Sequence, residues 1–258
     1  MIIGNQKEQK LIEKILQQDR ATILVFGPEG VGKFSFLETL IKNEKGEKII
    51  LNNENKFFSL ETAKLLTSLG KQKKERLIVL VNDAHKFSSQ AQNIFLKTIE
   101  EVVTPTIFIF VTHQLTKILP TIRSRSFWVK FSLVSAEETT NLLRDKGYND
   151  SEIKMALYFY PHQPGKAINL LAEKNKLSLL RKFFNLSHEE KLLLIEEIKK
   201  VFKPKEFIEL YLAMLKNNLK EYSFSEVIKI KEIYSLYADL DYNLNNDVHL
   251  ANLILNYG

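Results

Sequence analysis

The chain of 258 residues is 45% hydrophobic, carries a net charge of +6 and contains no cysteine. This length suits one to three domains with cores of their own, and no apolar run reaches the ~18 residues needed to cross a bilayer. The missing cysteines exclude disulfides and thiolate metal sites, and the spacing of the five histidines predicts no metal site. Because the start lacks the apolar stretch of a signal peptide, we expect a globular, cytoplasmic protein without a membrane partner.

The positive charge is concentrated in the first half of the chain. Residues 1–130 hold 20 Lys and Arg against 13 Asp and Glu, whereas residues 131–258 hold 17 against 18. A basic half suits contact with the phosphates of a nucleotide or a nucleic acid, and an ordinary solvated surface is the alternative.

Apolar runs alternate with helical patterns in the first half. Neither face of these runs shows regular polar alternation, so we expect five buried strands of a parallel sheet, at 22–27, 48–52, 76–83, 106–112 and 127–131. Helical spacing predicts helices over 33–43, 58–69 and 88–101, with Ser59 and Ser88 or Ser89 as N-caps and Gly70 as a stop. The alternation predicts a doubly wound α/β domain with ligands at the carboxyl ends of its strands.

Strand signals stop after residue 131. Ser135 with Glu138, and Ser187 with Glu190, have the spacing of capping boxes and open apolar-periodic segments. We expect helices at 136–146, 150–159, 164–173, 176–185, 188–202, 204–220, 224–240 and 246–256. The predicted organisation is an α/β domain over 1–132, a small helical domain over 133–173 and a second helical domain over 174–258.

The stretch GPEGVGK follows a predicted strand and opens a predicted helix, which is the context of a phosphate-binding loop. Its glycines let backbone amides approach phosphate oxygens, and Lys33 reaches them as a point charge. The predicted nucleotide-binding residues are Gly27, Pro28, Gly30, Val31, Gly32, Lys33 and Phe34. A loop that keeps the fold but binds neither ATP nor ADP is the alternative.

Three positions predict that hydrolysis in this chain is weak or absent. Phe34 stands where a Ser or Thr hydroxyl would hold Mg²⁺, and Ser35 is rotated by about 100° around the helix. Asn82 and Asp83 stand where an ATPase ends its third strand with a metal-binding Asp and a water-activating Glu. No arginine lies between residues 145 and 180, so Lys166 is the remaining candidate for a phosphate sensor there. A solvated lysine in the first turn of a helix is the alternative.

The stretch LPTIRSRS lies between the fourth and fifth predicted strands. Arg123 and Arg125 stand two residues apart, so a loop or short helix could present one guanidinium to a partner while the other anchors locally. An arginine supplied in trans stabilises charge on a γ-phosphate. Two surface arginines in weak ion pairs are the alternative.

In the order GPEGVGK, VLVNDAHKFSSQAQNIFLKTIEE, FIFVTHQ, LPTIRSRS and PGKA, the chain resembles the AAA+ clamp-loader subunits of bacterial DNA polymerase III, most closely their delta-prime class. The resemblance covers about residues 20–171. It implies an AAA+ P-loop domain, a helical lid and a C-terminal collar within a hetero-oligomer that loads the sliding clamp onto primed DNA.

The resemblance also implies residue roles. Arg125 is the arginine offered in trans to a neighbouring gamma/tau-type ATPase, Asn82 and Asp83 form a degenerate Walker B motif, and Thr112 and Lys166 occupy sensor-like positions. The implied partners are gamma/tau-type subunits and a delta subunit. No cofactor is required. No zinc is expected, because the four-cysteine module of many relatives is absent. Ser126 stands where the family's Ser-Arg-Cys motif has Cys. An ATP-hydrolysing gamma/tau-type motor and an unrelated P-loop enzyme are the alternatives.

Overall fold

The computed structural model describes residues 3–52, 76–101, 104–218 and 231–233. The predicted helices at 58–69 and 246–256, with Ser59 and Gly70, lie outside the described residues, as does the predicted helix 224–240 except for residues 231–233, which are helical. Within the described residues, the chain divides into two compact units, Met1–Leu142 with His162–Gly165, and Leu143–Pro161 with the chain from Lys166 onward. No described helix combines the length and the apolar character that a membrane crossing requires.

The first unit contains a five-stranded sheet in which every neighbouring pair is parallel. The strand order is β2-β3-β4-β1-β5, so β1 lies between β4 and β5. The strands are β1 (Ala21–Phe26), β2 (Glu47–Leu51), β3 (Leu77–Val81), β4 (Thr106–Thr112) and β5 (Phe127–Lys130). The predicted parallel α/β sheet is therefore confirmed.

The prediction that all five strands are buried is correct only for the three central ones. Every residue of β3 and β4 is buried, as are the four inner residues of β1. The edge strands β2 and β5 are largely exposed, because each has a neighbour on one side only. Trp128 and Phe127 of β5 remain about half exposed, at 49% and 48%.

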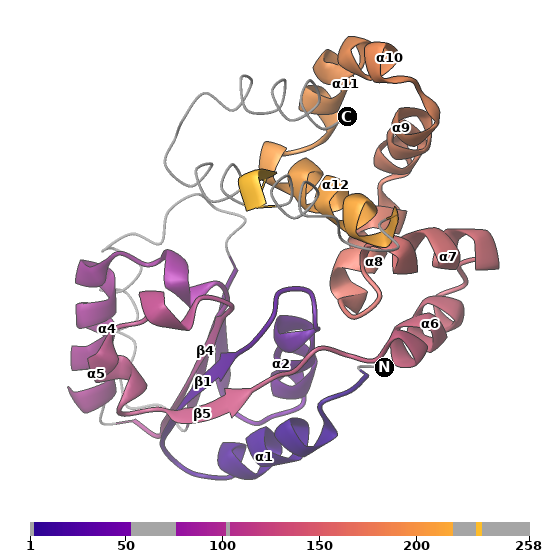
Figure 1. Cartoon of the computed structure of the whole chain (residues 1–258). Coiled ribbons are helices and arrows are strands. Elements are labelled where there is room, and N and C mark those ends of the chain that lie inside the picture. The colour runs from indigo at the N-terminus through magenta and orange to yellow at the C-terminus, as the bar shows by residue number, and fades with distance from the viewer. Residues whose placement is uncertain (1–2, 53–75, 102–103, 219–230, 234–258) are drawn as a thin grey trace. The chain divides into compact units, whose positions relative to one another are not determined.

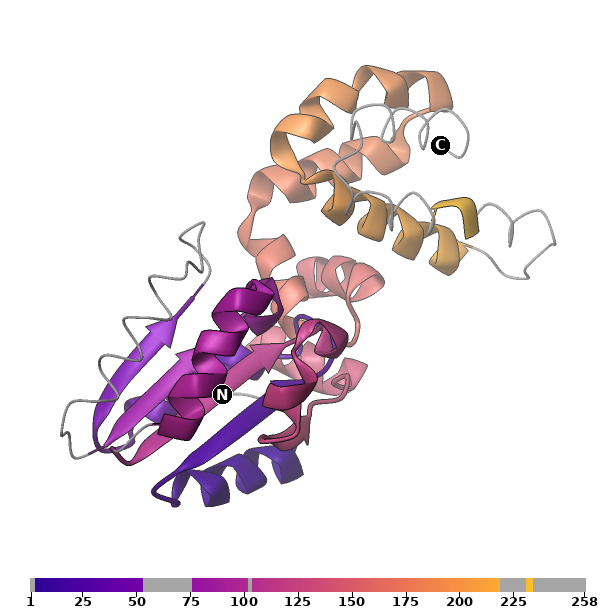
Figure 2. The same cartoon turned by 90° about the vertical axis from the view of Figure 1, so that its left-hand side faces the viewer.

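Helices cover both faces of the sheet (Figures 1 and 2). One face packs against α1 (Gln6–Leu16) and α2 (Lys33–Lys42) through residues such as Ile12 and Leu37. The other face packs against α4 (Ser89–Glu101) and α5 (Pro120–Arg123) through residues such as Phe95 and Ile122. Two short 3₁₀ helices, η1 (Ala84–Lys86) and η2 (Leu115–Lys117), follow β3 and β4. This three-layer arrangement places the ends of β1, β3 and β4 at one edge.

The described helices beyond residue 131 confirm that the second half is helical. They are α6 (Ala136–Asp145), α7 (Asp150–Phe159), α8 (Pro164–Ala172), α9 (Lys174–Asn185), α10 (His188–Leu193), α11 (Ile195–Val201) and α12 (Pro204–Asn218). Phe183, Phe207 and Tyr211 are fully buried in the core of the second unit, where Phe183 meets the other two rings edge-on.

Caps explain where several helices begin. The Glu138 carboxylate accepts from the Ser135 amide, and the Ser135 hydroxyl accepts from the Glu138 amide, which confirms the predicted capping box. Ser88 caps α4 by accepting from the Ala91 amide. Asn149 and Glu152 form a further capping box at α7 that was not predicted.

One predicted helix is wrong in extent. The segment 188–202 is two helices, because the Leu194 amide bonds to the Lys191 carbonyl in a tight turn that buries the Leu194 side chain. A hydrophobic residue that turns the chain toward the core carries no helix-stop signal in the sequence.

Candidate functional site

The predicted phosphate-binding loop joins β1 to α2, and its glycines adopt conformations that other residues avoid. Gly27, Gly30 and Gly32 have φ of 140°, 76° and 89°. At Gly27, a Cβ atom would lie 2.1 Å from the carbonyl oxygen of Phe131, so a side chain would collide with backbone. The loop is therefore a tight turn that only glycine fits at Gly27, and it lies directly against the segment after β5.

Lys33 lies buried inside this loop and is engaged by the loop itself. Its Nζ donates to the carbonyl of Gly27 at 2.9 Å and to that of Pro28 at 2.5 Å. Burial lowers the pKa of Lys33 to about 8, with partial opposition from the negative charges of Glu29 and Asp83. A phosphate group would have to draw the ammonium away from two acceptors.

The residue after Lys33 supplies no oxygen for a metal. Phe34 is half-buried and packs against the core between the sheet and α1 and α2. Ser35 is exposed, and its own carbonyl accepts from the Thr39 hydroxyl one turn later. The first turn of α2 therefore contributes apolar packing where an ATPase has a hydroxyl.

A short segment of the first unit holds the loop from another side. The Gly165 amide donates to the Gly30 carbonyl at 2.7 Å, and the Gln163 side chain donates to the Glu29 carbonyl at 3.1 Å. A Cβ atom on Gly165 would lie 2.9 Å from the Gly30 oxygen, which explains why glycine stands at this position. These two hydrogen bonds hold the backbone of the loop at Glu29 and Gly30.

The sensor candidate Lys166 lies in the second unit, where its ammonium forms an ion pair with a carboxylate. Its Nζ lies 2.5 Å from a carboxylate oxygen of Glu209 and 5.6 Å from the centre of the Tyr160 ring.

The metal side of an ATP site is not built at the end of β3 either. The Asn82 amide donates to the Asn52 side chain at 3.0 Å and brings no negative charge. Asp83 adopts a left-handed backbone conformation with φ of 49°, and its Oδ2 lies 2.6 Å from the Lys86 ammonium. Together with Phe34, these residues do not fit the magnesium coordination that ATP hydrolysis requires.

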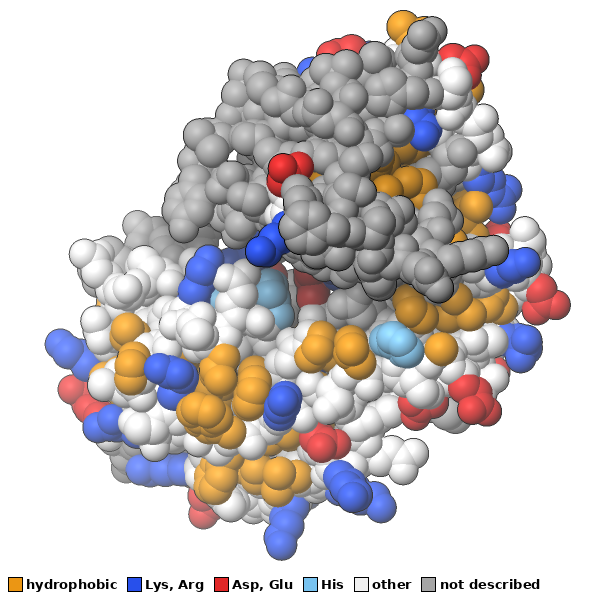
Figure 3. All heavy atoms as spheres, viewed as in Figure 1, with side chains coloured by type: hydrophobic (Ala, Val, Ile, Leu, Met, Phe, Trp, Pro, Cys, Tyr) orange, Lys and Arg blue, Asp and Glu red, His pale blue; other side chains and the backbone are white. Residues whose placement is uncertain are grey.

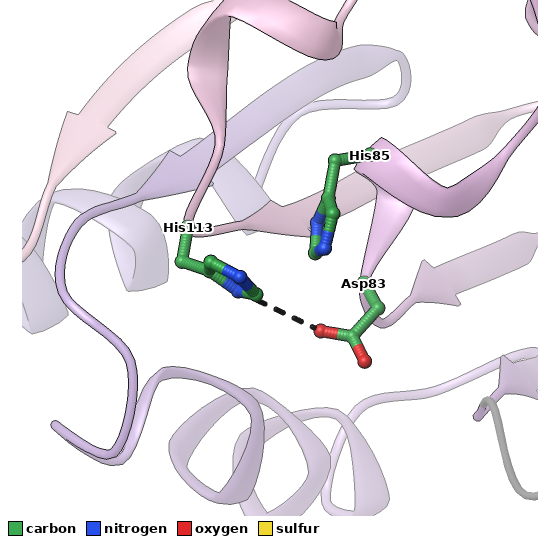
Figure 4. Close-up of side chains that lie close together, drawn as sticks. All are labelled: Asp83, His85 and His113. Carbon is green, nitrogen blue, oxygen red and sulfur yellow. Dashed lines mark ion pairs between the residues drawn. The ribbon is translucent and has the colours of Figure 1, made fainter. Parts of the chain in front are cut away.

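The structure brings together two histidines whose positions in the sequence predicted no pairing. His85 of η1 and His113, directly after β4, lie with ring centres 4.2 Å apart, and Asp83 lies beside them (Figure 4). They converge because β3 and β4 are parallel neighbours that end at the same edge of the sheet. Both strands were predicted, and each histidine closely follows a strand end, but the adjacency of the two strands comes from the structure.

The surroundings favour the neutral form of both rings. Burial, and then the proximity of His113, lower the pKa of His85 to about 4. Burial also lowers the pKa of His113, while the negative charges of Glu29 and Asp83 oppose this effect. The hydroxyl of Thr112, the other sensor-like residue, lies 3.1 Å from Nδ1 of His85. Thr112 thus orients a histidine.

Arg125 follows α5 and is the more exposed of the two predicted arginines. Its Nη2 lies 2.9 Å from Oε1 of Glu100, and its Nη1 donates to the Thr121 carbonyl at 3.2 Å. Both side chains of the ion pair are close to half exposed, at 45% and 48%. Arg123 is half-buried, and its Nε has no hydrogen-bond partner among the described residues. The described local contacts therefore belong to Arg125, whereas Arg123 is the more buried of the two, and the presentation of one guanidinium to a partner stays a prediction.

Residues 49–135 match the family model described as "DNA polymerase III, delta subunit". The replication factor C small subunit of Picrophilus torridus is 26% identical over 167 residues, which cover 58% of this chain and 50% of the relative. The DNA polymerase III subunit gamma of Buchnera aphidicola is 30% identical over 131 residues, covering 48% of this chain and 36% of the relative. The chain is therefore similar to subunits of replication factor C and of DNA polymerase III.

The fold agrees with the sequence matches. A DNA polymerase III gamma subunit-related protein of Thermotoga maritima superposes with a TM-score of 0.64 at 18% identity, covering 96% of this chain and 97% of that one. The predicted fold, a five-stranded parallel sheet with helices, is thus confirmed. The chain spans about half the length of the replication factor C relatives that it matches.

Proposed function

We propose that the chain is a delta-prime-type subunit of a DNA polymerase III clamp loader, which takes part in DNA replication without hydrolysing ATP itself. In this proposal it supplies Arg125 in trans to ATP bound by a neighbouring gamma/tau-type subunit, and it serves as a stationary member of the ring. Residues 1–132 would be the AAA+ domain, residues 133–173 the lid and residues 174–258 the collar.

One combination of features carries the proposal. Phe34 and Asn82 leave the phosphate loop without two metal contacts, while Arg125 remains near the surface in an exposed ion pair. Exposed ion pairs contribute about 0–1 kcal/mol, so the Glu100 contact can be exchanged for a phosphate at little cost. A chain that retained Arg125 but lost its own metal ligands would serve a neighbour's catalysis better than its own.

The proposed partners follow from the same assignment. They are gamma/tau-type ATPase subunits and a delta subunit, with the sliding clamp and primed DNA engaged through the whole complex in the cytoplasm. DNA contact by this chain would be made by lysines and backbone amides to phosphates, without sequence readout. No cofactor is required, and ATP or ADP in the loop would compete with the bonds that Lys33 already makes.

A gamma/tau-type motor is the second candidate, because gamma-type proteins are among both the sequence matches and the matching structures. Such a motor needs a hydroxyl after Lys33 and a carboxylate at the end of β3. The chain has Phe34 and Asn82 at these places.

The two candidates differ in what the isolated chain does. Purified protein with ATP and Mg²⁺ is expected to release no phosphate above the background of a Lys33→Ala control. Mixing with gamma/tau-type and delta subunits is expected to give one larger species by light scattering. Steady turnover by the isolated chain would support the motor, and failure to enter any complex with these subunits would contradict a clamp-loader role.

A further inference from the structure

A cluster of metal-binding side chains lies at the carboxyl end of β3 and β4. One donor atom each from Asp83, His85 and His113 lies within 4.8 Å of the other two. Figure 4 shows the two imidazole rings and the carboxylate directed toward a common point, from η1 on one side and from the segment after β4 on the other. The proposed function of the chain uses neither histidine.

One pair of these donors has a spacing close to that of a metal site. Oδ1 of Asp83 lies 4.0 Å from Nδ1 of His113, which is too far for a hydrogen bond. Ligands on a tetrahedral metal with bonds of 2.0–2.1 Å lie about 3.4 Å apart. Side-chain rotations that shorten the observed separation by well under 1 Å would bring this pair to that distance.

The neighbouring residues prepare the cluster. Thr112 Oγ1 lies 3.1 Å from Nδ1 of His85, a contact that orients the ring and leaves Nε2 for a ligand. Asp83 has a left-handed backbone with φ of 49°, a conformation that costs a non-glycine residue free energy and directs its side chain into the cluster. The Lys86 ammonium lies 2.6 Å from Oδ2 of Asp83 and would compete with a metal ion for the carboxylate.

We propose that Asp83, His85 and His113 form a binding site for one divalent transition-metal ion of the zinc type, which joins the ends of β3 and β4. This departs from the expectation of no metal, which rested on spacing along the chain rather than in space. Imidazole nitrogens suit Zn²⁺ and Co²⁺, whereas Mg²⁺ prefers a shell of oxygens. Two nitrogens and one carboxylate leave a fourth position for water.

The test uses the full chain without an affinity tag, freed of metal by a chelator and titrated with Zn²⁺ by calorimetry. We expect one Zn²⁺ per chain, no measurable binding of Mg²⁺, and a higher melting temperature with Zn²⁺. Co²⁺ should give visible absorption bands of a nitrogen- and oxygen-ligated ion, which Zn²⁺ then removes.

Variants identify the ligands. His85→Gln, His113→Gln and Asp83→Asn should each weaken Zn²⁺ binding by at least about tenfold, because each removes a direct ligand. His162→Gln is the matched control, since His162 contacts the Val134 carbonyl outside the cluster and its loss should leave binding unchanged. Lys86→Gln should strengthen binding about two- to fivefold by freeing the Asp83 carboxylate.

The proposal would be overturned if the wild type bound no Zn²⁺, or if His113→Gln bound Zn²⁺ as strongly as the wild type. Weaker Zn²⁺ binding in Lys86→Gln would also overturn it. His113 is only half-buried, so His113→Gln is the variant expected to stay folded, and circular dichroism checks this. The readout is metal binding alone, so the result does not depend on clamp-loader activity.

Discussion

The ammonium of Lys33 is hydrogen-bonded to the loop that contains it. This group is buried and donates to the carbonyls of Gly27 and Pro28. Two acceptors offset part of the cost of burying the charge, and the remaining cost appears as the lowered pKa. The residue that would attract a nucleotide is therefore also a source of instability near neutral pH.

The pH dependence of that instability is a first prediction. The folded pKa of about 8 lies below the unfolded value of 10.5, so between these values the unfolded chain holds a proton that the folded chain has released. Stability consequently rises with pH across this window, and the cost of burying the charge is fully present below pH 8. In urea unfolding, the stability of Lys33→Met relative to wild type should fall by about 2–3 kcal/mol between pH 7 and pH 10. A constant difference would show that Lys33 titrates normally.

Phe34 supports a second prediction at the same scale. Phe34→Thr restores the hydroxyl after Lys33, but Asn82 still brings no charge to a metal, so ATP turnover by the isolated chain should stay at background. The half-buried ring packs on the core beside α1, so the free energy of unfolding should fall by about 1–2 kcal/mol. Substantial turnover by Phe34→Thr would contradict the account. Phe34→Leu separates the loss of packing from the gain of a hydroxyl.

At the scale of elements, the turn between β1 and α2 depends on contact with the segment after β5. We predict that Gly27→Ala lowers the melting temperature of the sheet-containing unit sharply, equivalent to at least about 3 kcal/mol, because its Cβ would meet the Phe131 carbonyl oxygen at 2.1 Å. Gly147→Ala is the control. Gly147 has a φ of 85° but nothing within 4 Å of a Cβ, so this variant should cost only about 1 kcal/mol.

An equal loss of stability in both glycine variants would mean that backbone strain alone decides the outcome. Fluorescence of Trp128, which lies on β5 near this turn, follows the unfolding of the first unit, and circular dichroism follows the helices of both units.

Much of the architecture could be predicted from the sequence because buried strands and capped helices leave local signals. The runs that became β1, β3 and β4 are continuous and β-branched, and Ser135 with Glu138 marks a helix start. Strand order, and therefore which strands are exposed edges, is set by long-range pairing. α1 was missed although its buried positions, Ile12, Ile15 and Leu16, have helical spacing.

The candidate site also contains residues that the sequence identifies and residues that only the fold brings together. The loop glycines and Lys33 are contiguous, so one motif identifies them, but the convergence of His85 and His113 requires two strands to pair first. Arg123 and Arg125 differ in burial, which spacing along the chain does not encode.

At the scale of the whole molecule, the chain combines a sheet-containing unit with a helical unit. The face in Figure 3 shows hydrophobic side chains among basic ones over β5, the exposed edge strand that carries Phe127 and Trp128. Apolar side chains at a sheet edge are suited to contact with another protein. The hetero-oligomer in our proposal would supply such a partner.

The central claim is that Arg125 acts on a neighbour's ATP, and ATPase measurements on the reconstituted complex test it most directly. Arg125→Ala should lower the ATPase of the gamma/tau-type subunits by at least about tenfold while the complex still assembles. Arg125→Lys should recover little, because a lysine cannot reproduce the planar fork of the guanidinium. Arg144→Ala, which removes an exposed arginine of an ion pair with Asp150, should have no effect. An intact complex with unchanged ATPase in Arg125→Ala would contradict the account.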